Sequence, residues 1–225
     1  MMVRAIRHAA AMLGAGILAV HPLQAAAQDY TSSFDNVLGT QMRAPKDFRA
    51  NYSSSLETAV ARSADGSKGR IGVAALDLAT GQEIAVLGDQ RFPMASTSKV
   101  AIAATFLDGV DKGRWSLGSE FPLMVPVASQ PFSTSVAPVR KGTYLPASQL
   151  LELMLTRSSN QATDALLAAI GGPEVVNRWV QKAGITEFRL DRDIATLVRD
   201  DGEFDPASHI DQRDSATPRA MVQLL

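Results

Sequence analysis

Residues 94–99 read Met94-Ala95-Ser96-Thr97-Ser98-Lys99, at the point where the most apolar predicted helix of the chain, residues 98–109, begins. Helical residues three apart share a face, so Lys99 can reach the Ser96 hydroxyl. A serine needs a base beside it to become a good nucleophile, and burial lowers the pKa of a lysine towards that role. Only one of the six lysines has a serine three residues before it. The pattern therefore predicts Ser96 as a nucleophile and Lys99 as its base.

The composition excludes several other chemistries. The chain has 225 residues, 46% of them hydrophobic and 20% charged, with a net charge of −1, which is typical of a globular protein without a basic surface for nucleic acid. It has no cysteine, so thiol nucleophiles and disulfides are excluded. Of the three histidines, His8 and His21 fall within residues 1–27, a predicted export signal, so the mature chain keeps only His209. With one histidine and no cysteine, we expect no metal site, and no organic cofactor is implied.

The N-terminus has the pattern of an export signal. Arg4 and Arg7 precede an uncharged apolar run over residues 9–20, and three alanines follow at 25–27. This order predicts a signal peptide over residues 1–27 and a mature domain over residues 28–225. The apolar run is too short to span a bilayer, so we expect a periplasmic or secreted protein without stable membrane insertion. A membrane anchor is the alternative.

The rest of the chain predicts an α+β fold. Apolar runs around a Gly-containing turn predict a β-hairpin over residues 70–87. Five prolines predict that residues 116–146 form loops with at most short regular pieces, and residues 189–214 are charged and irregular. Besides residues 98–109, the predicted helices are residues 56–64, 146–155, 162–170, 173–183 and one that starts at Thr217-Pro218. A single hairpin is marginally stable, so we expect strands that complete its sheet to lie beyond Leu225.

The segment around Ser96 resembles the nucleophile segment of the class A β-lactamases, which are penicillin-recognising serine hydrolases. It runs Arg91-Phe92-Pro93-Met94-Ala95-Ser96-Thr97-Ser98-Lys99-Val100, and Ser158-Ser159-Asn160 follows at the distance where that family has Ser-Asp-Asn. Alone, Ser-Ser-Asn is an ordinary helix-capping loop. The resemblance covers residues 56–225 and implies a helical domain with an antiparallel sheet. It also implies that Ser158 shuttles a proton and that Asn160 binds the amide side chain of the substrate.

The resemblance extends to the family's Ω-loop, with two departures. Arg192 and Asp214 fall where the family has the ion pair at the neck of that loop. The family's water-activating glutamate is replaced by Ile194, so either an acid of the longer loop, Glu203 being the first candidate, takes over or deacylation is slow. The family's Lys-Thr-Gly motif, which binds the substrate carboxylate, is not present by Leu225. We expect the chain to be truncated before it.

The resemblance implies hydrolysis of β-lactam antibiotics through a serine acyl-enzyme. The substrate is a small molecule, and we expect a monomer that binds no nucleic acid. One alternative is a D-alanyl-D-alanine peptidase or esterase on the same scaffold, which the missing glutamate favours. Another is a non-catalytic acyl-binding protein or a defective fragment.

Overall fold

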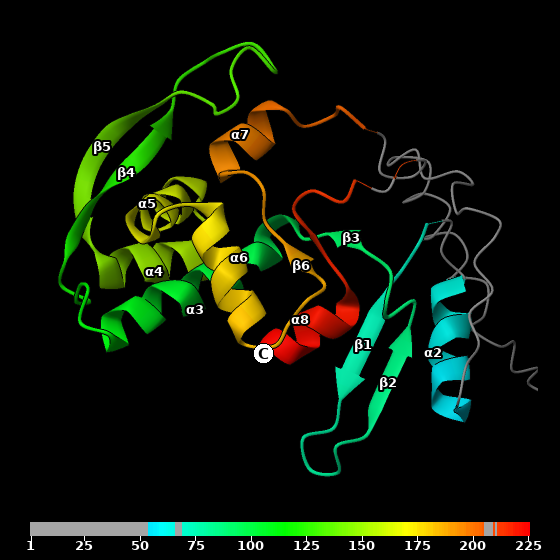
Figure 1. Cartoon of the computed structure of the whole chain (residues 1–225). Helices are drawn as coiled ribbons and strands as arrows, with labels where there is room; N and C mark the ends of the chain where they lie inside the picture. Colours follow the sequence, from blue (N-terminus) through cyan, green and yellow to red (C-terminus); the bar gives the residue numbers. More distant parts are fainter. Residues whose placement is uncertain (1–53, 66–68, 205–208, 210) are drawn as a thin grey trace, which may run out of the picture. The chain divides into compact units, whose positions relative to one another are not determined.

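The computed structural model describes residues 54–65, 69–204, 209 and 211–225, and the predicted signal peptide lies outside them. The helices are α2 (Ser55–Asp65), the 3-10 turn η1 (Ala95–Thr97), α3 (Ser98–Asp111), α4 (Ala147–Thr156), α5 (Asn160–Ile170), α6 (Pro173–Lys182), α7 (Ile194–Arg199) and α8 (Pro218–Leu224). The strands are β1 (Val73–Leu76), β2 (Glu83–Val86), β3 (Phe92–Pro93), β4 (Glu120–Pro126), β5 (Val139–Pro146), β6 (Phe188–Arg189) and β7 (Ser215–Ala216). They pair as β1–β2, β3–β7–β6 and β4–β5, all antiparallel. The hairpins β1–β2 and β4–β5 can be followed in Figure 1. The predicted α+β class is confirmed.

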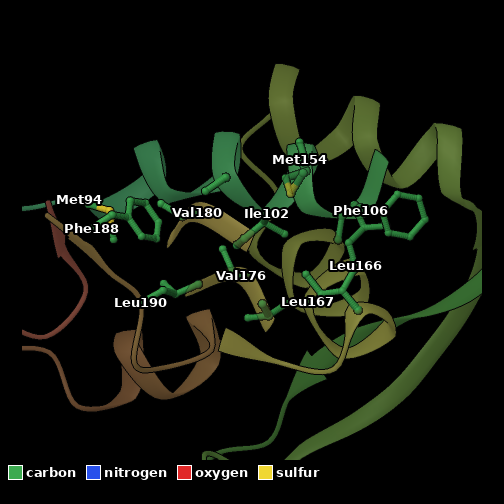
Figure 2. Packing of buried hydrophobic residues seen from close by; sticks show 14 of the residues in the cluster. Met94, Ile102, Phe106, Met154, Leu166, Leu167, Val176, Val180, Phe188 and Leu190 are labelled. Carbon is green, nitrogen blue, oxygen red and sulfur yellow. The ribbon is translucent and has the colours of Figure 1, made fainter. Parts of the chain in front are cut away.

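The hydrophobic core lies between α3, α4, α5 and α6 (Figure 2). Ile102 and Phe106 of α3 are fully buried, as are Leu150 of α4 and Leu166 of α5. Burying a side chain of this size stabilises the fold by about 1.5–3 kcal/mol. The predicted helices over residues 98–109, 146–155, 162–170 and 173–183 are confirmed to within a few residues. Their packing gives the site a rigid base.

The predicted hairpin is confirmed as β1–β2, with Val73 paired to Val86 and Leu76 to Glu83. Asp77 stabilises its turn by accepting a 2.6 Å hydrogen bond from the Thr80 hydroxyl. The helix predicted at Thr217-Pro218 is also confirmed, because the Thr217 side chain accepts the Ala220 N–H at the start of α8. None of the described helices has the length and hydropathy that a bilayer crossing requires.

The prediction of loops over residues 116–146 is wrong, because β4 and β5 form a second hairpin there. Pro126 and Pro146 end the two strands, and the pairing shifts register between Pro122 and Met124. A two-stranded ribbon leaves an outer edge on each strand, where the missing N–H of a proline breaks no ladder bond. The prolines therefore do not exclude strands here. The expectation of a single hairpin is also wrong, because the described residues form two, β1–β2 and β4–β5.

The prediction that residues 189–214 are irregular is wrong at α7. Asp193 caps this helix, since its side chain accepts the Thr196 N–H at 2.7 Å. On either side of the loop, β6 and β7 pair with each other, and β7 also pairs with β3. This small sheet brings both ends of the loop next to the strand that leads into Ser96.

Candidate active site

Ser96 lies in η1, between β3 and α3, and its side chain is accessible to solvent. Ala95 before it has a φ of 46°, a left-handed conformation that costs a residue with a side chain about 1–3 kcal/mol. The turn is held by hydrogen bonds from Thr97 Oγ1 to Met94 O at 2.6 Å and from Ser98 Oγ to Ala95 O at 2.8 Å. The strained turn presents the Ser96 hydroxyl outwards at the start of a buried helix.

Lys99 lies in the first turn of α3 and is 3% exposed. Its Nζ donates to Ser158 O at 2.7 Å, Ser158 Oγ at 2.8 Å and Asn160 Oδ1 at 2.9 Å. It also lies 3.3 Å from Ser96 Oγ. One buried amine thus contacts all three polar residues that the sequence predicts to surround it.

The corner between α4 and α5 presents Ser158 to the nucleophile. The N–H groups of Arg157 and Ser159 both donate to Leu153 O, and Ser158 has a φ of 52°. Its hydroxyl lies 3.0 Å from Ser96 Oγ and donates to it. Ser159 caps α5, with its side chain accepting the Ala162 N–H. The structure therefore brings together Ser96, Lys99, Ser158 and Asn160, called the reactive centre below.

Burial lowers the pKa of Lys99, and the negative charge of Asp164 partly opposes that effect. A lysine with a lowered pKa is more often neutral, and a neutral amine can accept a proton. Because Ser96 and Ser158 are both within hydrogen-bond reach, the amine can exchange protons with either hydroxyl. This arrangement can activate a serine and return its proton to a leaving group.

A cavity of about 390 Å³ opens beside Asn160. Ile194, Ala195 and Val198 line it from α7, and the ends of the β4–β5 connection line the rest with residues 126–129 and 137. Its walls are mostly apolar, and Asn160 and Arg199 contribute an amide and a guanidinium to the lining. The cavity fits an apolar group attached to a polar unit that Asn160 can bind.

Residues 189–217 are called the loop region below. Asp214 holds the two ends of this region together. Asp214 Oδ2 lies 2.5 Å from Arg192 Nε, and Oδ1 accepts the N–H groups of Asp191 and Arg192 at 2.8 and 3.0 Å. The Asp214 side chain is 4% exposed. The two residues predicted to pair are therefore paired, and the carboxylate also satisfies the turn that follows β6.

Three side chains tie α7 to the β4–β5 connection. Thr196 Oγ1 accepts the Ala137 N–H at 2.8 Å, and Asp200 Oδ1 accepts the Phe132 N–H at 2.9 Å. Arg199 donates to Thr134 O at 2.7 Å and pairs with Asp200. This contact was not predicted, since it joins residues more than fifty positions apart. Two of its residues, Ala137 and Arg199, line the cavity beside Asn160.

The side chain of Glu203 contacts Arg213 and not a residue of the reactive centre. Its carboxylate is 2.5 Å from a nitrogen of Arg213, which also pairs with Asp211 at 2.8 Å. The guanidinium of Arg213 lies over the Phe204 ring. Phe204 therefore stacks against the partner of Glu203. Glu203 lines a second cavity, of about 280 Å³, which Ala95 also borders.

Asp164, on the buried face of α5, was missed. It lies four residues after Asn160, so both share one face of the helix, and a carboxylate among Ala162, Ala165 and Leu166 was the available signal. Within the part of the chain that the structure describes, no cluster of three or more His, Cys, Asp or Glu side chains could hold a metal ion.

The chain matches the model of the β-lactamase enzyme family over residues 55–225. It is 31% identical to β-lactamase OXY-2 of Klebsiella oxytoca, over 71% of this chain and 52% of that protein. It is 34% identical to β-lactamase Toho-2 of Escherichia coli, over 68% of this chain and 50% of that protein. An ancestral class A β-lactamase (GNCA) superposes with a TM-score of 0.60 at 36% identity, covering 74% of this chain and 61% of that one. The chain spans about half the length of the curated relatives it matches.

Proposed function

Because this chain belongs to the β-lactamase enzyme family, as a class A-like member, we propose that it opens β-lactam rings through an acyl-enzyme on Ser96. The observation that carries the proposal is the contact of one buried amine with two serines. Lys99 Nζ is 3.3 Å from the Ser96 hydroxyl and 2.8 Å from the Ser158 hydroxyl. Ser96 itself is open to solvent, as a nucleophile must be.

Acylation begins with neutral Lys99 taking the proton of Ser96 as its oxygen attacks the lactam carbonyl carbon. A C–O bond forms, and the carbon–nitrogen bond of the lactam breaks. The proton on Lys99 passes through the Ser158 hydroxyl, 2.8 Å away, to the departing nitrogen. Ser158 regains a proton from Lys99 as it gives up its own, so the amine ends neutral. General base catalysis of this kind contributes about 10²–10⁴-fold to a rate.

Asn160 orients the substrate. Its side-chain oxygen accepts from Lys99 at 2.9 Å, which points the amide nitrogen to other acceptors. That nitrogen can donate to the carbonyl of an acylamino group on the lactam ring. The apolar part of such a group fits the cavity lined by Ile194 and Val198. The favoured substrate is therefore a β-lactam with an apolar acylamino side chain.

Release of the acyl group is slow in this proposal. Water attack needs a carboxylate within hydrogen-bond reach, and two acids of the described loop region are engaged by other partners. Asp193 caps α7 by accepting the Thr196 N–H, and Glu203 is paired with Arg213. Ile194, at the position where the resemblance places the activating glutamate, is a buried hydrocarbon.

Slow release favours a second candidate function. A peptide that ends in D-alanyl-D-alanine can also acylate Ser96. The terminal D-alanine then leaves as the amine, which Ser158 protonates. Ile194 in the cavity wall is the observation that favours it. A peptidase of this kind would be labelled by penicillins and would turn them over poorly.

Two further proposals concern the cell. We propose export with cleavage after residue 27, which agrees with the basic start and the three alanines. N-terminal sequencing of the protein from a periplasmic extract should then begin at Gln28. An intact N-terminus on membrane-bound protein would contradict this. We also propose that the protein acts as a monomer.

The function is tested by fluorescent penicillin labelling alongside nitrocefin hydrolysis. The wild type should take up label and hydrolyse nitrocefin slowly, and Ser96→Ala should do neither. Labelling without nitrocefin hydrolysis, together with release of D-alanine from a pentapeptide, would favour the peptidase. Equal labelling of the wild type and Ser96→Ala would contradict both functions.

A further inference from the structure

Ser129 lies in the connection between β4 and β5, residues 127–138, and its hydroxyl oxygen is buried. Among the residues that the structure describes, none forms a hydrogen bond with this oxygen. The large majority of buried side-chain polar atoms have a partner, so the exception needs an explanation. Ser129 also lines the cavity beside Asn160. The unpartnered hydroxyl therefore belongs to the wall of the cavity in which the acylamino side chain of a β-lactam is proposed to lie.

Two other hydroxyls of the same connection are satisfied. Ser133 Oγ donates to Gln130 O at 2.8 Å, and Thr134 Oγ1 donates to Val136 O at 2.7 Å. Neither Ser133 nor Thr134 is among the described residues that line the cavity. Ser129 differs from both in lining the cavity and in lacking a partner.

The charge of the lining is already balanced. Of the described lining residues, Arg199 alone is charged, and it pairs with Asp200 through contacts of 2.7 and 2.8 Å. The two side chains are 7% and 8% exposed. A charged group that entered this mostly apolar cavity would lose water without meeting a free counter-ion, which is costly. The cavity therefore favours an uncharged ligand.

The wall that carries Ser129 is fixed on both sides of it. The Val127 N–H donates to Pro138 O at 2.8 Å, and the Ala137 N–H donates to Thr196 Oγ1 of α7, also at 2.8 Å. The Ser129 hydroxyl can turn about its own Cα–Cβ bond between staggered positions while this backbone stays in place. Because no described residue holds the hydroxyl, turning it towards a ligand in the cavity breaks no bond.

We propose that Ser129 is a specificity-determining residue, whose hydroxyl binds a neutral hydroxyl group on an otherwise apolar acylamino side chain. A serine hydroxyl can donate and accept, so it suits such a partner. A purely apolar side chain would fill the cavity and leave Ser129 unpartnered. One neutral hydrogen bond of this kind changes affinity about 2- to 10-fold. This inference rests on the proposed function for the identity of the substrate, whereas the preference of the cavity itself can be measured without a reaction.

The test compares phenylacetamide with 4-hydroxyphenylacetamide, which differ by one hydroxyl and represent the acylamino side chain without the lactam ring. Their affinities are measured by NMR titration, from the shifts of the Ala137 and Ala195 backbone amides. The hydroxylated amide should bind the wild type about 2- to 10-fold more tightly, and Ser129→Ala should lose this preference. Equal affinities for the wild type, a preference that survives in Ser129→Ala, or binding of neither amide would overturn the proposal.

Ser133→Ala is the matched control. It removes a hydroxyl from the same connection, but one that is bonded to Gln130 O and lies outside the described lining. Its preference between the two amides should equal that of the wild type. Ser129→Ala should also unfold at no lower temperature than the wild type, because removing an unpartnered buried hydroxyl breaks no bond. A larger loss of stability in Ser129→Ala than in Ser133→Ala would show that the hydroxyl has a structural partner, and would overturn the proposal.

Acylation gives the last readout, with benzylpenicillin and its 4-hydroxybenzyl analogue, which carry the same two side chains. The hydroxylated penicillin should acylate Ser96 faster in the wild type and in Ser133→Ala, and the difference should vanish in Ser129→Ala. The same ratio of rates in all three proteins would overturn the proposal. Failure of both penicillins to acylate the wild type, with the preference between the amides intact, would count against the proposed function alone.

Discussion

The reactive centre and the loop region are held in place by different forces. Lys99 and Asn160 lie in α3 and α5, and Ser96 lies in the turn η1 just before α3. The two helices pack together through fully buried side chains such as Ile102 and Leu166 (Figure 2). The loop region is held by carboxylates that accept backbone N–H groups, two each at Asp214 and Asp164. Apolar packing changes little with pH, whereas carboxylate acceptors are weakened by protonation. We therefore expect the two regions to respond differently to mutation and to acid.

The largest effect is expected at Lys99. Lys99→Ala should reduce the rate of Ser96 acylation by about 10²–10⁴-fold, because it removes the proposed base. The circular dichroism spectrum should stay unchanged, because the apolar faces of α3 and α5 remain. Lys112→Ala, on an exposed pair with Asp108 at the other end of α3, is the matched control. Near-normal labelling of Lys99→Ala would show that another group activates Ser96.

The loop region should lose stability at Asp214. Asp214→Asn removes the carboxylate nearest to the Arg192 guanidinium, from a side chain that is 4% exposed, and leaves Arg192 with only the more distant Asp211 at 3.9 Å. Breaking a buried pair in this way costs about 3 kcal/mol, measurable as the free energy of unfolding in urea. The exposed pair offers a comparison, since Asp108→Asn should cost less than about 1 kcal/mol. Equal losses in the two variants would show that Asp214 does not hold the loop region.

These two regions also differ in how well sequence alone predicted them. The Ser96–Lys99 spacing and the apolar run after it are local signals, and both elements they predicted are present. Ser158 and Asn160 were found through their order and distance from Ser96. The grouping of these four residues was therefore predictable, because they occur in short motifs at the starts of α3 and α5.

The loop region was harder because its order comes from distant partners. α7 has six residues and is stabilised by Asp164 of another helix, so its own sequence carries little helical signal. The β4–β5 hairpin was missed because its prolines stand at strand ends and at a shift of register. The contact of Asp164 with α7 was not predicted, because Asp164 lies outside every motif. A carboxylate on an apolar helix face was the signal that could have indicated it.

Acid should act on the link between α7 and the β4–β5 connection. Asp200 pairs with Arg199 and accepts the Phe132 N–H, and these two contacts, the first more than the second, lower its pKa to about 2. A depressed carboxyl pKa stabilises the fold above the usual value near 4 and loses that effect as the pH falls towards 2. Asp200→Asn should therefore be less stable than the wild type at pH 6, with the difference shrinking below pH 4. A difference that stays constant from pH 6 to 2 would contradict this role.

The smallest effect is expected at Glu203. Its carboxylate is engaged by Arg213, so Glu203→Gln should leave the lifetime of the acyl-enzyme unchanged. Ile194→Glu, which places a carboxylate beside the cavity, should shorten that lifetime. A trapped adduct in Glu203→Gln would show instead that the loop region supplies the deacylating base.

In the proposed reaction, the buried Lys99 amine makes Ser96 the acylated residue. Mass spectrometry of peptides after incubation with a penicillin measures this directly. We expect one adduct, of the intact penicillin mass, on the Ser96 peptide and none in Ser96→Ala. An adduct on any other serine, or one that persists in Ser96→Ala, would contradict it.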